Sequence, residues 1–187
     1  MKKQYLFLSL FVLSLLSTST FAQDHKMWIG VDLGFNSHKV GDADNTSQFS
    51  IAPTFGYHLS EAMAIGIRVG YASPGKDISA FGVNPFFRYG KSIGDKATLF
   101  GELGIDYVSG SDKTNSSAEI KTSAFGVGIS PGVTYMFADN WGLEAHFGHL
   151  GFDSESEEVG SADAVKTTDF GLDLTMSSLS FGLTYHF

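Results

Sequence analysis

The chain has 187 residues, with 12 Lys and Arg against 20 Asp and Glu, which gives a formal net charge of −8 at pH 7. This length fits one domain with a substantial core, and the acidic balance argues against nucleic acid as a partner. Because the chain has no Cys, disulfides, thiolate catalysis and cysteine zinc sites are excluded. It combines 22 Gly and 17 Phe, a composition that disfavours helices and indicates strands.

Residues 1–22 have the pattern of a secretory signal peptide. Lys2 and Lys3 precede an almost wholly apolar run, and the small residues around Ala22 fit a signal-peptidase site. The alternative is an N-terminal membrane anchor, but the apolar run is short for a membrane span. We predict cleavage after Ala22, which leaves a barrel domain over 23–187 with 10 basic and 20 acidic residues.

The mature chain alternates apolar and polar residues with the period of two that is typical of β-strands. The alternation recurs in eight segments, over 27–36, 49–57, 63–72, 81–90, 98–107, 125–135, 141–148 and 178–187. Four joins are polar and taken as the long set (39–46, 73–77, 109–119 and 153–168), although 73–77 is no longer than two of the three short joins (58–62, 91–95 and 138–140). Long and short joins at alternate ends predict an all-β protein, an eight-stranded antiparallel up-and-down transmembrane β-barrel.

The last strand is expected to begin before its regular segment. From Phe170 to Met176 the apolar residues fall on even positions, and after Ser178 they fall on odd positions. One extra residue near Ser177 and Ser178 would cause this change of phase, so we predict a β-bulge there.

The composition of the two faces indicates a barrel in a membrane. The polar face consists mainly of Gly, Ala, Ser and Thr, which suit the crowded interior of an eight-stranded barrel. The apolar face is rich in Phe and Tyr, and most of its tyrosines lie near strand ends, where an aromatic girdle at the lipid–water boundary belongs. A secreted soluble barrel that binds an apolar ligand is the alternative, but its outer face would carry more Lys and Glu.

The segment 50–70, SIAPTFGYHLSEAMAIGIRVG, resembles the strand–turn–strand of the small outer-membrane β-barrel family, the type related to OmpX and the OmpA transmembrane domain. The ending LSFGLTYHF, which carries Phe181, Leu183, Tyr185 and Phe187, resembles the C-terminal signal that the barrel-assembly machinery recognises. The resemblance implies an exported protein integral to the cell outer membrane and in contact with its lipid, with periplasmic chain ends and outward long loops. It does not select a role, because the family contains adhesins, structural proteins, small pores and lipid-modifying enzymes.

Seven ionisable residues fall on the predicted inner face. They are Asp32, Arg68, Arg88, Glu102, Asp106, Glu144 and His146. Charges inside a narrow barrel must be paired or solvated, so we expect a network in which the two arginines face Glu102 and Glu144. The alternative is a narrow or gated pore for ions or small solutes, although eight strands leave little room beyond their own side chains.

The residues indicate no catalytic, metal or cofactor site. His58, Ser60 and Glu61 share one turn, but closeness in sequence does not make a triad, and no G-x-S-x-G motif occurs between a strand and a helix. His146 and His149 would face opposite sides of one strand, which disfavours a metal site. We expect a non-enzymatic protein that contributes to envelope integrity or surface interaction through its loops, with a lipid-modifying enzyme as the alternative.

The segment 153–169 carries six acidic residues and Lys166 as its only cation. We interpret it as a solvated, mobile external loop. Binding of divalent cations that bridge to lipid phosphates, or of a basic partner, is the alternative, although the EF-hand spacing is absent.

Overall fold

The computed structural model describes residues 26–38, 46–75, 77–114, 119–160, 163–173 and 180–187. Its strands are β1 (Met27–His38), β2 (Thr46–His58), β3 (Met63–Gly75), β4 (Ile78–Ile93), β5 (Ala97–Asp112), β6 (Ile120–Met136), β7 (Trp141–His146), β8 (His149–Val159), β9 (Val165–Asp173) and β10 (Ser180–His186). Among the described residues, no helix is long and apolar enough to cross a membrane.

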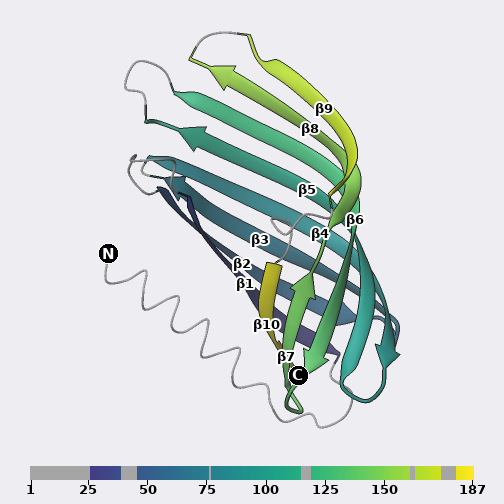
Figure 1. Cartoon of the computed structure of the whole chain (residues 1–187). Coiled ribbons are helices and arrows are strands. Elements are labelled where there is room, and N and C mark those ends of the chain that lie inside the picture. Colours follow the sequence, from purple (N-terminus) through teal and green to yellow (C-terminus); the bar gives the residue numbers. More distant parts are fainter. Residues whose placement is uncertain (1–25, 39–45, 76, 115–118, 161–162, 174–179) are drawn as a thin grey trace.

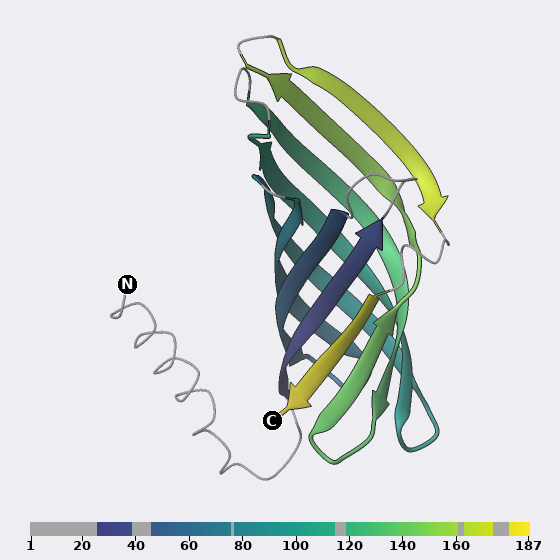
Figure 2. The same ribbon diagram turned by 60° about the vertical axis from the view of Figure 1, so that its left-hand side comes forward.

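Eight of these strands form a closed ring in which neighbours run antiparallel. β1 to β6 pair in chain order, β6 pairs with β7, β7 pairs with β10, and β10 returns to β1. Trp28 lies opposite His186 and Asp32 lies opposite Gly182 where the ring closes. Figure 2 shows β1 and β10 side by side at this closure. The expected eight-stranded antiparallel barrel is confirmed.

The other two strands extend one wall of the barrel. β8 continues along β6 beyond the end of β7, and β9 pairs with β8. The seventh expected strand, 141–148, corresponds to β7 alone, and β8 begins beyond its expected end; the expected eighth strand, with its earlier start, is divided into β9 and β10. In Figure 1 the β8–β9 hairpin rises at the end of the barrel opposite the C-terminus. We call this the hairpin end, and we call the end that holds Phe187 the terminal end.

One glycine accounts for the division between β7 and β8. Gly148 has a φ of +82°, a left-handed backbone conformation that favours glycine. The amide of Phe147 still donates to a β6 carbonyl over 3.0 Å, so the chain stays attached to β6 across the break. Beyond it the register on β6 shifts by one residue, which brings the ring of His149 to the inner face beside Gly128. The expectation that His146 and His149 face opposite sides is therefore wrong.

The acidic segment 153–169 is mostly strand. Asp153 lies opposite Asp169, and Glu157 lies opposite Val165 in the β8–β9 hairpin. The expectation of a loop here is wrong, because β6 and β9 supply backbone partners to both edges of β8. The charge pattern indicated a polar surface, but it could not show that the backbone of this segment pairs with neighbouring strands.

The start of the last strand also differs from the expectation. β9 begins at Val165, ahead of the expected start at Phe170. This earlier start follows from the pairing with β8, which extends to Glu157 opposite Val165. The bulge predicted near Ser177 and Ser178 lies outside the described residues.

The outer face of the barrel is apolar in every strand. Phe55, Ile105 and Leu143, for example, expose 44%, 48% and 54% of their surface. Exposed outward aromatic residues also lie toward both ends of the barrel: Tyr57, Tyr89, Tyr135 and Trp141 toward the terminal end, and Phe49, Tyr71, Phe81, Tyr107 and Phe125 toward the hairpin end. Such an extensive exposed apolar band fits a surface that meets hydrocarbon, with aromatic girdles at its two boundaries.

Three inward aromatic rings each lie opposite a glycine of the neighbouring strand. Trp28 pairs with Gly56, Phe86 with Gly66, and Phe100 with Gly132. A Cβ atom added at any of these glycines would overlap the ring opposite it. The large rings therefore fit into the barrel because the facing positions have no side chain.

Two glycines of β3 provide a test of this packing. Gly66→Ala should lower the free energy of unfolding by about 1–3 kcal/mol, because the new methyl group meets Phe86 and also the Phe55 carbonyl at 2.6 Å. Gly70→Ala on the same strand should be tolerated, because no atom lies within 4 Å of the added Cβ. The measurement is a urea titration of each variant in lipid vesicles, with the folded fraction read from heat-dependent gel mobility. Equal stability of the two variants would contradict the packing described here.

Candidate functional site

The interior charges meet in one layer that crosses the barrel. Arg68 lies on β3, Arg88 on β4, Glu102 on β5, and Glu144 and His146 on β7. Arg88, Glu102 and Glu144 expose only 8%, 4% and 4% of their surface. Charges buried to this extent must be offset by partners, because their desolvation is costly.

Arg88 is held between two carboxylates from different strands. Its Nη1 and Nη2 donate to the two oxygens of Glu144 over 2.7 and 2.8 Å. Its Nε and Nη2 donate to Oε2 of Glu102 over 3.2 and 2.8 Å. Thr134 adds a further hydrogen bond to Glu144, over 3.1 Å. The planar guanidinium with its several donors suits this arrangement, whereas a lysine ammonium could not reproduce it.

Arg68 extends the network toward β1. Its Nη1 donates to Oε1 of Glu102 over 3.0 Å, so Glu102 bridges the two arginines. Its Nε donates to Oδ2 of Asp32 over 3.2 Å, and its Nη1 also donates to Oδ1 of Asn84 over 3.1 Å. The network thus joins β1, β3, β4, β5 and β7 across the interior.

His146 joins the layer through Glu144. Its Nε2 lies 2.9 Å from Oε1 of Glu144 and 3.5 Å from Nη2 of Arg68. A carboxylate oxygen accepts and a guanidinium only donates, so one nitrogen cannot form a hydrogen bond with both. The shorter contact assigns the Nε2 proton to the bond with Glu144.

Asp106 is connected to the arginines only indirectly. It accepts a hydrogen bond from Nδ2 of Asn84 over 2.8 Å, and Asn84 in turn accepts from Arg68. The charge pattern placed Asp106 on the inner face with the other ionisable residues. The structure shows that an uncharged amide makes the link.

Aromatic rings fill the space around the two guanidinium groups. Cζ of Arg88 lies 3.9 Å from the centroid of Phe100 and 5.2 Å from that of Trp28. The ring of Phe86 lies 5.3 Å from Cζ of Arg68 and 5.4 Å from that of Arg88. These distances fit cation–π contacts, which strengthen when water is excluded. The layer is therefore packed like a core, and we call it the interior plug.

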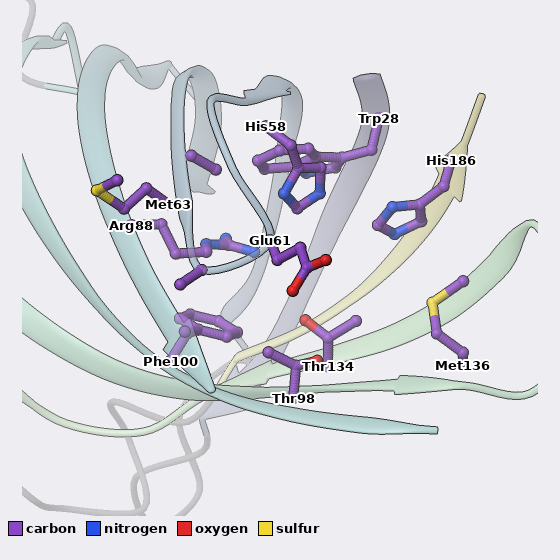
Figure 3. Close-up of a pocket in the computed structure, with 13 residues that line it drawn as sticks. Trp28, His58, Glu61, Met63, Arg88, Thr98, Phe100, Thr134, Met136 and His186 are labelled. Atoms are coloured by element: carbon purple, nitrogen blue, oxygen red, sulfur yellow. The ribbon is translucent and has the colours of Figure 1, made fainter. Parts of the chain in front are cut away.

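A pocket of about 210 Å³ opens on the terminal side of the plug. Figure 3 shows Trp28, His58, Phe100 and His186 around it. The three rings of Trp28, His58 and His186 cluster here: the centroid of Trp28 lies 4.7 Å from that of His58, with the rings tilted, and 6.1 Å from that of His186, with the rings stacked. The pocket also reaches Arg88, whose guanidinium is already paired with two carboxylates.

The turn after β2 does not assemble a hydrolase site. Oγ of Ser60 accepts hydrogen bonds from the amides of Ala62 and Met63 over 3.3 and 3.1 Å, so it stabilises the turn. The ring of His58 packs against that of Trp28 in a tilted arrangement. Within the described ranges, no group of three His, Cys, Asp or Glu side chains is arranged to hold a metal ion.

The residues of the C-terminal pattern lie on the outer face at the end of the chain. Phe181 and Leu183 expose 62% and 38% of their surface. Tyr185 packs edge-on against Trp141 at 4.9 Å and stacks with Phe187 at 6.2 Å. The backbone of Phe187 exchanges two hydrogen bonds with β1. Recognition of these residues by the assembly machinery stays a prediction.

Sequence reasoning missed the uncharged part of the plug. It did not single out Asn84, Thr134 or the rings of Trp28, Phe86 and Phe100. The alternation of apolar and polar residues places all five on the inner face, and this placement was the only indication of their role that the sequence offered. A period of two shows which side chains point inward but does not show which of them meet across a barrel.

Comparisons with known proteins agree with this architecture. The family model of the outer membrane protein beta-barrel domain matches residues 8–187. The N-terminal β-barrel domain of OprF from Pseudomonas aeruginosa is similar with a TM-score of 0.56 and 12% identity, over 88% of this chain and 100% of that one. Neisserial surface protein A is similar with a TM-score of 0.50 and 15% identity, over 86% and 97%. A search of the curated proteins found no match.

Removal of the central arginine should reveal how much the plug contributes to stability. Arg88→Met leaves Glu102 and Glu144 buried without this cation, so we expect a loss of about 3–5 kcal/mol in the free energy of unfolding. The matched control is Lys113→Met, which breaks an exposed ion pair with Glu119 and should cost less than about 1 kcal/mol. The same urea titration measures both variants.

If Arg88→Met fails to fold, Arg88→Lys provides the comparison. It keeps the charge and loses the planar set of donors, so it should fold with a stability below that of the parent. A parent-like stability for Arg88→Met would show that the plug does not hold the barrel together.

Proposed function

The chain belongs to the outer membrane protein beta-barrel domain family, and on that premise we propose that it is a non-enzymatic envelope protein with a closed barrel. The observation that carries the proposal is the interior plug, in which Arg88 is paired with two carboxylates and lies against the ring of Phe100. Its barrel would serve envelope integrity, and its hairpin end would serve surface interaction. We retain residues 1–22 as the proposed signal peptide that directs export.

The closed interior favours this role over a pore. Every ionic side chain of the central layer has a charged partner within 3.2 Å, and the rings of Trp28, Phe86 and Phe100 occupy the space between them. A water-filled passage would need open space along the barrel axis, and the interior of an eight-stranded barrel is just wide enough for its own side chains to fill. The enzyme alternative lacks a comparable observation, because Ser60 stabilises a turn and His58 packs against Trp28.

Lipid and the assembly machinery are the partners that we propose. The outward apolar band supports contact with lipid, and the outward Phe181 and Leu183 on β10 are accessible to a recognition surface. In bacterial barrels the short turns are periplasmic and the longer connections are extracellular. The terminal end would therefore face the periplasm, and the β8–β9 hairpin would face outward.

Conductance separates a closed barrel from a pore. The purified parent protein should give no current steps in a planar bilayer. The double variant Arg88→Ala/Phe100→Ala should give steps, because it removes the guanidinium and the ring that lie against each other at 3.9 Å. Leu103→Ala, at an exposed outer position of β5, is the control and should remain silent. Current through the folded parent protein would overturn the closed-barrel proposal.

Complementation separates the roles of the barrel and the hairpin. A strain without this protein should become more sensitive to detergent, and the parent chain should restore resistance. A variant in which residues 155–167 are replaced by a short turn keeps the closed ring and should restore resistance as well. It should lose any adhesion or partner binding that the parent shows. Full sensitivity with a correctly inserted short variant would assign the envelope role to the hairpin, against the proposal.

A further inference from the structure

A groove lined by both aromatic and polar side chains lies on the outer surface of the barrel at the hairpin end. It encloses about 290 Å³, more space than a single ion or water needs. Its lining includes Tyr71, Ser79, Phe81, Ser109, Ser111 and Lys121, which come from β3, β4, β5 and β6. The upper part of Figure 1 shows these four strands at the end of the barrel where the hairpin rises.

The register places the groove at the upper boundary of the apolar band. Tyr71 lies opposite Phe81, and Phe81 lies opposite Ser109 on the same outer face. One step farther toward the hairpin end, Ser79 lies opposite Ser111, and Ser111 lies opposite Lys121. The outer surface thus changes from aromatic rings to hydroxyl groups and an ammonium within a few residues. This is the level at which lipid headgroups meet a transmembrane barrel.

Lys121 gives the groove a cation at its upper edge. Its side chain is exposed, and the described part of the chain contains no ion-pair partner for it within 4.0 Å. Glu119 also lines the groove, but its carboxylate is 3.5 Å from Nζ of Lys113. Glu158 lies opposite Lys121 on β8 and is the other acidic neighbour on this face. The free ammonium of Lys121 is therefore available to an external anion.

We propose that this groove binds the headgroup of a phosphorylated glycolipid of the outer leaflet. Lys121 pairs with a phosphate of the lipid, and the hydroxyls of Ser109 and Ser111 exchange hydrogen bonds with its sugar. Tyr71 and Phe81 lie below and contact the sugar ring or the first carbons of the acyl chains. Because the groove opens on the outer side of the barrel wall, a ligand embedded in the membrane reaches it directly.

The proposal depends on the location of the barrel in the outer membrane and not on the envelope role proposed above. A barrel with no effect on detergent resistance could still bind such a lipid. A barrel that supports the envelope could do so without a defined lipid site. Lipid binding to the purified protein tests the groove alone.

The experiment titrates the purified full-length mature protein, folded in detergent, with bis-phosphorylated lipid A and detects the complexes by native mass spectrometry. Lys121→Ala should weaken binding about fivefold, the effect of one basic side chain near an anionic headgroup. The matched control is Lys166→Ala on β9, an exposed outward lysine that does not line the groove, and it should bind like the parent. Heat-dependent gel mobility checks that each variant is folded.

Two further arms identify the part of the ligand that is recognised. Dephosphorylated lipid A should bind the parent protein about as weakly as phosphorylated lipid A binds Lys121→Ala, and Lys121→Ala should not weaken it further. An excess of inorganic phosphate should not displace the lipid, because the groove also contacts the sugar and acyl parts. Ser109→Ala/Ser111→Ala should weaken binding of both lipids.

Three results would overturn the proposal. One is parent-like binding by folded Lys121→Ala, and another is an equal loss in Lys166→Ala, which would indicate nonspecific charge attraction. The third is displacement of the lipid by inorganic phosphate, which would indicate a simple anion site.

Discussion

Closure of the sheet between β1 and β10 is the constraint on which the rest of this structure depends. In hydrocarbon, an open strand edge leaves backbone amides and carbonyls without partners, so the last strand must return to the first. Here five residues of β1, from Trp28 to Asp32, meet β10. Once eight strands form a ring, the cross-section of the interior is small and fixed, and every inward side chain must fit inside it.

That confinement explains both features of the interior. Aromatic rings such as Phe100 fit because glycine lies opposite them, and charges such as Arg88 are tolerated because carboxylates surround them. Arg88 and Glu144 are 56 residues apart in the chain, so their pairing favours one arrangement of distant strands over register-shifted alternatives. Burying such a pair gains little stability over an apolar core, whereas losing one partner is costly. The plug therefore contributes to the specificity of the fold as well as to closing the barrel.

The outer surface of the barrel meets hydrocarbon along its apolar band and a polar environment beyond that band. It reaches both because several strands are longer than the hydrocarbon is thick. β4, β5 and β6 have 16, 16 and 17 residues, whereas a tilted strand needs about 9–11 to cross the hydrocarbon. The surplus extends beyond the apolar band at the hairpin end, where serines and Lys121 replace aromatic side chains. The same extension supports β8 and β9, so the acidic segment is presented on a paired sheet. The surfaces that can distinguish one ligand or partner from another are concentrated at this end.

The sequence by itself determined the fold class, the inner and outer faces and most of the strands, because alternation is a local property of the chain. It placed Arg68, Arg88, Glu102 and Glu144 on one face for the same reason. It did not show that Gly148 shifts the phase and turns His149 inward, that 153–169 forms a hairpin, or that Asn84 links Asp106 to Arg68. Only the tertiary structure decided these points, because each depends on which residues of paired strands lie opposite one another, and a local alternation does not specify that register.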